Sequence, residues 1–315
     1  MKPSVPPHTT MPLSSTRSEL LKTRLDQFTR VLNAVEQGDV RGLHRARVAS
    51  RRLRELMPML QLDHDKSRKL RRQLKKVTRR LGAVRELDVL LLLVDELHVA
   101  RRGRTGSLGR VGISVAKDRD DARKRLETRL PIERMRRLGE KLNRMVEELR
   151  VIEATPARAT ARSWSAGVDA QVAARAARLA AAMNDAGAMY FPERLHAVRI
   201  AMKKLRYALE LSNELSGTKR DPQLMALKRG QELLGRMHDL QVLIERVRQV
   251  QASLAPPNVT IWRNLDALIA SLEDECRVLH ARYMRLRERL MAAADALSAR
   301  TAGAAAANGL SRRAG

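Results

Sequence analysis

The sequence is poor in cysteine and in aromatic residues. Cys276 is the single cysteine among 315 residues, so an intramolecular disulfide and a thiolate-rich metal site are both excluded. A chain without disulfides suits a reducing compartment, and we therefore expect a cytoplasmic protein. Aromatic residues make up only 2% of the chain, which is few for a protein that stacks nucleic-acid bases.

Long apolar runs and strand patterns are also missing. The longest apolar run covers residues 89–94, far below the roughly 20 residues that a membrane span needs. Residues 1–15 lack the apolar run of a signal peptide, and we expect them to form a disordered tail. No stretch alternates as strands do, so we predict an all-α fold. Phosphate-binding GxxxxGK[ST] loops and GxSxG elbows are absent, so we predict no enzyme activity and no cofactor.

Acidic residues are far outnumbered by basic ones. The chain has 35 Asp and Glu against 62 Lys and Arg, which gives a formal net charge of +27. Such an excess attracts polyanions of every kind, including nucleic acid, anionic membrane surfaces, acidic proteins and inorganic polyphosphate. The partner must therefore be inferred from the pattern of the basic residues.

One basic helix is predicted twice. The stretch LHRARVASRRLREL, which begins at Leu43, aligns with LHAVRIAMKKLRYALEL, which begins at Leu195 and so lies 152 positions later. Downstream, LGAVRELDVLL aligns with LGRMHDLQVLI, with Gly82 opposite Gly235. We expect Gly82 to close or tighten its helix. Two motifs that recur in the same order at nearly the same spacing indicate an internal duplication.

The duplication sets the expected domain organisation. We predict a first helical bundle over residues 16–153 and a second over 164–300, each with four or more helices. The segment 154–163 is predicted as a linker, and 301–315 as a low-complexity tail. The sequence does not indicate an oligomeric state.

Each copy of the basic helix carries cations along one face. At about 100° per residue, the first basic face holds His44, Arg47, Arg51 and Arg54, and the second basic face holds His196, Arg199, Lys203 and Arg206. Small and aliphatic residues, such as Leu53 and Leu205, occupy the opposite sides and predict burial there. An ordinary solvated face would mix charges of both signs. We interpret the two basic faces as anion-binding surfaces, with a solvated charged face as the alternative.

The scarcity of aromatic residues bears on which anion is bound. Arginine and lysine bind phosphate oxygens of a polyphosphate or of a nucleic-acid backbone alike, but only Tyr207 lies beside a basic face. Base-reading motifs are absent too. We therefore favour a phosphate chain without bases, with non-specific nucleic-acid binding as the second hypothesis.

The histidines raise a third hypothesis, a metal-dependent phosphohydrolase that uses His44 or His196. Neither has a His or Cys partner at metal-binding spacing. We therefore predict no metal site, and expect hydrogen bonds from these two side chains to phosphate or to a neighbouring carboxylate. We interpret His238, beside Asp239, as structural.

Together, the four motifs resemble the paired signatures of the CHAD domain, the conserved histidine α-helical domain family. The resemblance covers roughly residues 16–300. It implies two helical bundles related by pseudo-twofold symmetry, with basic helices that face a shared cleft or pore. It also implies binding of inorganic polyphosphate and association with polyphosphate granules, without catalysis.

The resemblance also assigns polyphosphate-binding positions. These are the histidines His44 and His196, the basic positions Arg47, Arg51, Arg52, Arg54, Arg199, Lys203, Lys204 and Arg206, and the additional positions Arg72, Lys75, Arg79, Lys228 and Arg229. Where the family usually has Arg-Asp-x-Asp, this chain has Arg85-Glu86-Leu87-Asp88, and in the second half Gln241 replaces the later Asp. These departures affect the expected acidic positions and leave the basic faces unchanged.

Overall fold

The chain folds into helices throughout its described part. The computed structural model describes residues 16–100, 105–154, 158–218, 221–254 and 258–311, and every regular element in these ranges is a helix. The all-α prediction is therefore confirmed. No helix in the described ranges is long and apolar enough to cross a lipid bilayer.

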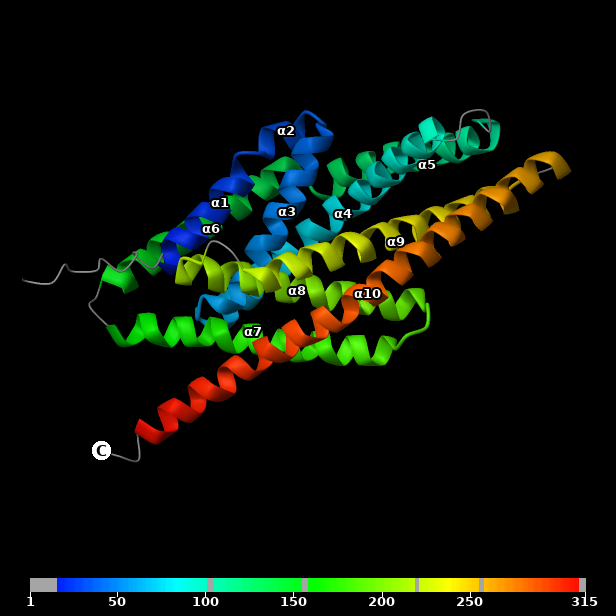
Figure 1. Cartoon of the computed structure of the whole chain (residues 1–315). Coiled ribbons are helices and arrows are strands. Elements are labelled where there is room, and N and C mark those ends of the chain that lie inside the picture. The colour runs from blue at the N-terminus through cyan, green and yellow to red at the C-terminus, as the bar shows by residue number, and fades with distance from the viewer. Residues whose placement is uncertain (1–15, 101–104, 155–157, 219–220, 255–257, 312–315) are drawn as a thin grey trace, which may run out of the picture.

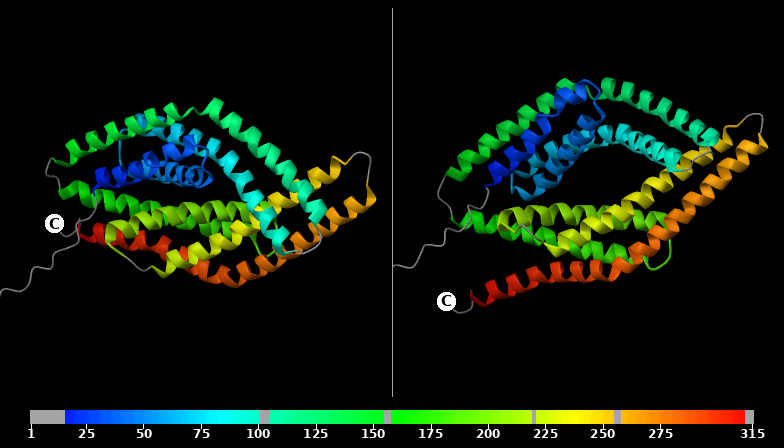
Figure 2. Two further views of the ribbon diagram at one scale, coloured as in Figure 1. Left: turned by 90° about the horizontal axis from the view of Figure 1, so that it is seen from above. Right: turned by 45° about the horizontal axis from the view of Figure 1, so that its top comes forward.

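The two halves of the chain form two groups of helices (Figure 1). The first half contains α1 (Arg17–Thr29), α2 (Leu32–Glu36), α3 (Val40–Leu56), the 3-10 helix η1 (Met57–Met59), α4 (His64–Ala100), α5 (Thr105–Arg129) and α6 (Ile132–Ala154). The second half contains α7 (Arg158–Ala186), α8 (Pro192–Ser216), α9 (Pro222–Ala252) and α10 (Val259–Ser311). Both further views show α4 and α5 extending toward the end where α9 and α10 meet (Figure 2).

Some helix bounds differ from those that the sequence predicted. Helix α7 begins at Arg158, inside the predicted linker 154–163, and α10 continues beyond residue 300 into the predicted tail. Both segments are rich in alanine, the strongest helix former, which favours helix over loop. Residues 155–157 and the predicted tail 1–15 lie outside the described residues.

The apolar sides of both basic helices are buried as predicted. Leu53 in α3 and Leu205 in α8 are fully buried, and both belong to a hydrophobic cluster that is contiguous across the two halves. Burying a leucine side chain contributes about 2 kcal/mol to stability. This burial fixes the rotation of each basic helix, so its cationic face points away from the core.

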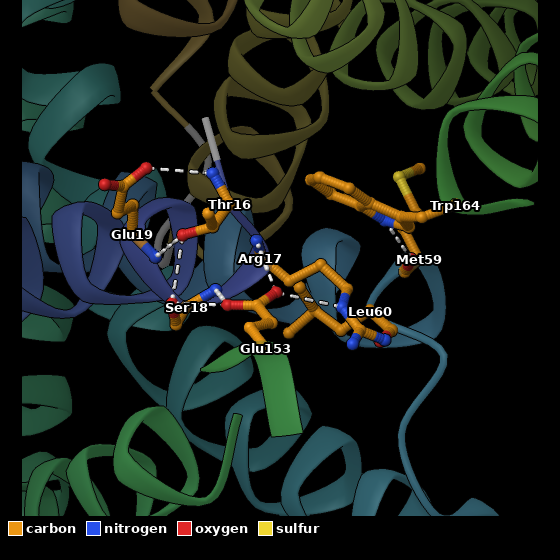
Figure 3. A network of polar contacts seen from close by, with 8 residues as sticks. All are labelled: Thr16, Arg17, Ser18, Glu19, Met59, Leu60, Glu153 and Trp164. Carbon is orange, nitrogen blue, oxygen red and sulfur yellow. Dashed lines mark hydrogen bonds and ion pairs between the residues drawn. The ribbon is translucent and has the colours of Figure 1, made fainter. Parts of the chain in front are cut away.

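A buried polar network within the first half ties the start of α1 to the end of α6, and a hydrogen bond close to it crosses to the second half (Figure 3). The Arg17 side chain donates to Glu153 of α6 at 3.1 Å and to the carbonyl of Leu60 at 3.2 Å. In the same region, Trp164 of α7 donates its indole N–H to the Met59 carbonyl at 2.7 Å. Since Met59 belongs to the first half and Trp164 to the second, this hydrogen bond fixes one end of the boundary between them.

Ion pairs connect the halves elsewhere along the boundary. Arg175 of α7 lies 3.3 Å from Glu55 of α3, and both side chains are largely buried. Toward the far end, Arg236 of α9 pairs with Glu96 of α4 at 2.8 Å. Contacts at both ends hold α3 and α4 at a defined distance from α8 and α9.

Candidate anion-binding cleft

A cleft of about 440 Å³, which we call the central cleft, lies where α3 and α4 of the first half meet α8 of the second. Its lining includes Arg47, Arg51, Arg54, Lys75, Arg79, Lys203 and Lys204, together with Thr78, Gly82, Ala83, Glu86, Ile200 and Tyr207. Glu86 is the only carboxylate among these lining residues. The cleft therefore carries a strong local excess of positive charge.

The two basic faces meet at this cleft. Arg47, Arg51 and Arg54 come from α3, and Lys203 comes from α8, about 150 positions later in the sequence. Helix α3 packs directly against both α4 and α8. Packing thus brings residues of both halves into one space, with α4 contributing the predicted positions Lys75 and Arg79.

Like charges crowd one another across the cleft. Burial, together with the nearby Arg199, Arg51 and Arg47 guanidinium groups, lowers the pKa of Lys203 to about 7. Burial, followed by Arg51, also lowers the pKa of Arg47, to about 10. An anion in the cleft would relieve this repulsion, because it would favour the charged forms of all these groups.

Several hydrogen-bond donors of the basic helices are unsatisfied. In the described residues, the Nε atoms of Arg47, Arg52, Arg199 and Arg206 are buried and have no hydrogen-bond partner. A buried donor left without a partner costs about 1–3 kcal/mol. Oxygen-rich anions could supply the missing acceptors, since guanidinium groups match phosphate and carboxylate oxygens.

Gly82 does not end its helix. Helix α4 continues through this position to Ala100, so the predicted closure is wrong. A Cβ at Gly82 would lie 3.2 Å from Nε of Arg47, whereas one at Gly235 would lie 4.0 Å from Nε of Arg199. The absence of a side chain at Gly82 therefore allows the Arg47 guanidinium to pack closely against α4.

Arg47 has one carboxylate neighbour. Its Nη2 lies 3.7 Å from Oε1 of Glu86, and the Glu86 side chain is mostly exposed. At this distance and exposure the ion pair is weak. Glu86 can orient Arg47 without neutralising the cleft.

The two histidines of the basic faces are not among the residues that line the central cleft, and they have different neighbours. Burial lowers the pKa of His44, and Arg85 is the next largest cause. The Nδ1 atoms of His196 and His238 lie 3.4 Å apart, and the ring centroids are separated by 4.7 Å. Burial, with Arg199 and His196 nearby, lowers the pKa of His238 to about 4.

Sequence reasoning interpreted His238 as structural and did not place it against His196, which is where the structure puts it. The alignment of Gly82 with Gly235 places His238 opposite Arg85, so the alignment could have drawn attention to this position. The described residues contain no group of three or more His, Cys, Asp or Glu side chains placed to hold a metal ion.

Several predicted positions lie away from the lining of the central cleft. Arg52 lines a small separate pocket with Arg24 and Glu55. Arg206 stacks over the Tyr207 ring at 4.9 Å and lies 3.7 Å from Glu210. Five predicted positions, His44, Arg72, His196, Lys228 and Arg229, are exposed and do not line the central cleft. Seven of the predicted polyphosphate-binding positions therefore line the central cleft.

The chain belongs to the CHAD domain family, whose model matches residues 19–248. Among solved structures, it is similar to the CHAD domain from the plant Ricinus communis, with 23% identity over 90% of this chain and 93% of that chain, and a TM-score of 0.56. It is also similar to PptA from Streptomyces chartreusis, with 18% identity over 86% of this chain and 98% of that chain, again with a TM-score of 0.56. The comparison with curated proteins found no match.

Proposed function

We propose that the protein binds inorganic polyphosphate in the central cleft and catalyses no reaction. The observation that carries the proposal is that residues of both basic faces line one cleft, where the buried Nε of Arg47 has no hydrogen-bond partner. A phosphate oxygen would satisfy this donor, and the charge of the phosphate would offset the repulsion among the cations. Membership of the CHAD family supports the same ligand class.

The lining of the cleft favours a phosphate chain without bases. Tyr207 is its only aromatic residue, and the Arg206 guanidinium covers that ring. Nucleic-acid channels of low sequence specificity usually present several aromatic faces for stacking. We propose that the protein is cytoplasmic and associates with polyphosphate granules, where such a chain would be abundant.

A direct affinity comparison tests the ligand. We expect binding to long-chain polyphosphate to be tighter than binding to duplex DNA or single-stranded RNA, all measured at one salt concentration. Equal or tighter binding to DNA would overturn the proposal in favour of a nucleic-acid-binding protein. Phosphate release in the presence of a divalent metal, abolished by His44→Ala, would support a phosphohydrolase instead.

Charge reversal tests the site. We expect Arg51→Glu combined with Lys203→Glu to weaken polyphosphate binding by about 100-fold, because each change removes a contact and adds repulsion. Arg137 and Arg144 are exposed on α6, outside the lining of the central cleft. Their combined change to Glu alters net charge equally and serves as the control. Equal losses in both variants would show that the basic faces are ordinary charged surfaces.

A further inference from the structure

A second basic cleft of about 410 Å³, which we call the outer cleft, lies between α4, α5 and α9. Its lining comprises Arg80, Ala83, Leu87, Asp118, Ala122, Arg125, Leu126, Arg129 and Arg246. The sequence predicted none of these arginines as binding residues. Like the central cleft, the outer cleft lies at the boundary between the two halves.

The two clefts adjoin at Ala83. This small, exposed residue lines both of them, and the consecutive residues Arg79 and Arg80 line the central and the outer cleft respectively. Consecutive residues of an α-helix are rotated by about 100°. The surface of α4 therefore leads from one cleft to the other within a single helical turn.

The charge in the outer cleft is largely uncompensated. Asp118, its only carboxylate, pairs with Arg246 at 2.5 Å. Within the described part of the chain, Arg80, Arg125 and Arg129 have no carboxylate partner, and the last two are exposed. Arg80 donates to the backbone carbonyl of Arg129, which holds its guanidinium at the C-terminal end of α5.

The remaining lining of the outer cleft is aliphatic. Leu87, Ala122 and Leu126 belong to this lining, which has no aromatic residue on which a base could stack. Cations beside aliphatic side chains suit a bare phosphate chain better than a nucleic acid.

We propose that a phosphate chain held in the central cleft continues past Ala83 into the outer cleft, where Arg80, Arg125 and Arg129 bind further phosphates. This inference rests on the proposed polyphosphate-binding function. The outer cleft is then a subsite that distinguishes long phosphate chains from short ones, because only a chain long enough to pass Ala83 gains affinity from its arginines. Short phosphate oligomers bind in the central cleft alone.

The test compares a short and a long ligand. With Arg125→Gln and Arg129→Gln combined, we expect affinity for long-chain polyphosphate to fall about tenfold, since two exposed cation–anion contacts are lost. Affinity for tripolyphosphate should stay within twofold. The control is Arg137→Gln with Arg144→Gln on α6, which removes equal charge and should change neither affinity by more than twofold.

A bulky residue at Ala83, where the two clefts adjoin, gives a second, independent test. Ala83→Phe should lower long-chain affinity by a similar factor, because the ring obstructs the passage between the clefts. Circular dichroism and the thermal midpoint would establish that both variants are folded. Equal losses for both ligands, or an unchanged long-chain affinity in the arginine variant, would overturn the inference.

Failure of this inference differs from failure of the proposed function. If wild-type protein binds polyphosphate and Arg51→Glu with Lys203→Glu abolishes binding, while the outer-cleft variant binds normally, the central cleft is the whole site. If neither polyphosphate nor tripolyphosphate binds wild-type protein, the proposed function itself is wrong.

Discussion

The two halves present similar basic helices to one cleft but surround their histidines differently. In the first half, His44 lies near the permanent cation Arg85. In the second half, His196 faces His238, which aligns with Arg85. An arginine stays charged at every physiological pH, whereas a histidine gains charge only on protonation. One half therefore offers fixed charge, and the other offers charge that depends on pH and on the ligand.

The halves also differ at one aligned position of the two basic helices. Glu55 of α3 carries a carboxylate that pairs with Arg54 at 2.9 Å and with Arg175 of the other half at 3.3 Å. The aligned residue of α8, Tyr207, instead faces the central cleft. The first helix thus anchors the boundary between the halves, while the second shapes the binding surface.

Breaking the buried pair should have the largest effect on stability. We expect Glu55→Gln to lower the free energy of unfolding by about 3 kcal/mol, because Arg175 would remain buried without its counter-charge. The partly exposed pair between Glu96 and Arg236 provides the comparison, and Glu96→Gln should cost less than about 1 kcal/mol. Urea unfolding followed by circular dichroism measures both. Similar losses of stability in the two variants would show that Glu55 does not anchor the boundary between the halves.

The aligned glycines should respond in opposite ways. We expect Gly82→Ala to displace the Arg47 guanidinium and weaken polyphosphate binding about fivefold, since the new methyl group would crowd it. Gly235→Ala has room at its site. It should leave affinity unchanged and raise the free energy of unfolding by up to about 1 kcal/mol through helix propensity. Paired titrations and denaturation curves check this, and equal affinity in both variants would contradict it.

Affinity should rise as pH falls. The pKa of Lys203 is lowered to about 7 and that of His238 to about 4 in the free protein. A bound phosphate chain raises both pKa values, so the complex holds more protons than its separate components. For each proton taken up on binding, affinity rises by at most about tenfold for every unit by which the pH falls. Titrations between pH 8 and pH 5 measure the slope, and a flat profile would contradict this coupling.

Substituting one half's residue into the other sharpens the pH comparison. His238→Arg gives the second half the fixed charge of the first, and we expect it to reduce the slope between pH 7 and pH 5 by about half. Lys203→Arg should instead flatten the slope near pH 7 and retain the acidic part. Calorimetry in buffers of different ionisation enthalpy would count the protons directly, and an unchanged count in His238→Arg would exclude its role.

The smallest effect is expected at predicted positions outside the central cleft. Individual changes of Arg72, Lys228 and Arg229 to Gln should each lower polyphosphate affinity less than about twofold, because these exposed side chains act only through screened, long-range charge. Affinity titrations at physiological salt check this. A loss as large as that of Arg51→Gln would extend the site beyond the clefts described above.

Periodicity predicted local features well. The apolar spacing around Leu53 and Leu205 correctly placed the buried sides of both basic helices, because burial of one stripe is the main force that orients an amphipathic helix. The role of Gly82 was not predictable in this way, because a glycine that receives a side chain from another helix leaves the same local pattern as one that ends a helix.

The sequence by itself determined the all-helical fold, the family and the composition of each basic face, because these depend on residue type and short-range spacing. Only the tertiary structure decided which cations share a space. Arg51 and Lys203 line one cleft because α3 packs against both α4 and α8, and such packing between distant segments has no local signature. For the same reason the sequence did not reveal the outer cleft, whose arginines lie on three helices: Arg246 of α9 reaches the arginines of α4 and α5 only after the two halves have packed together.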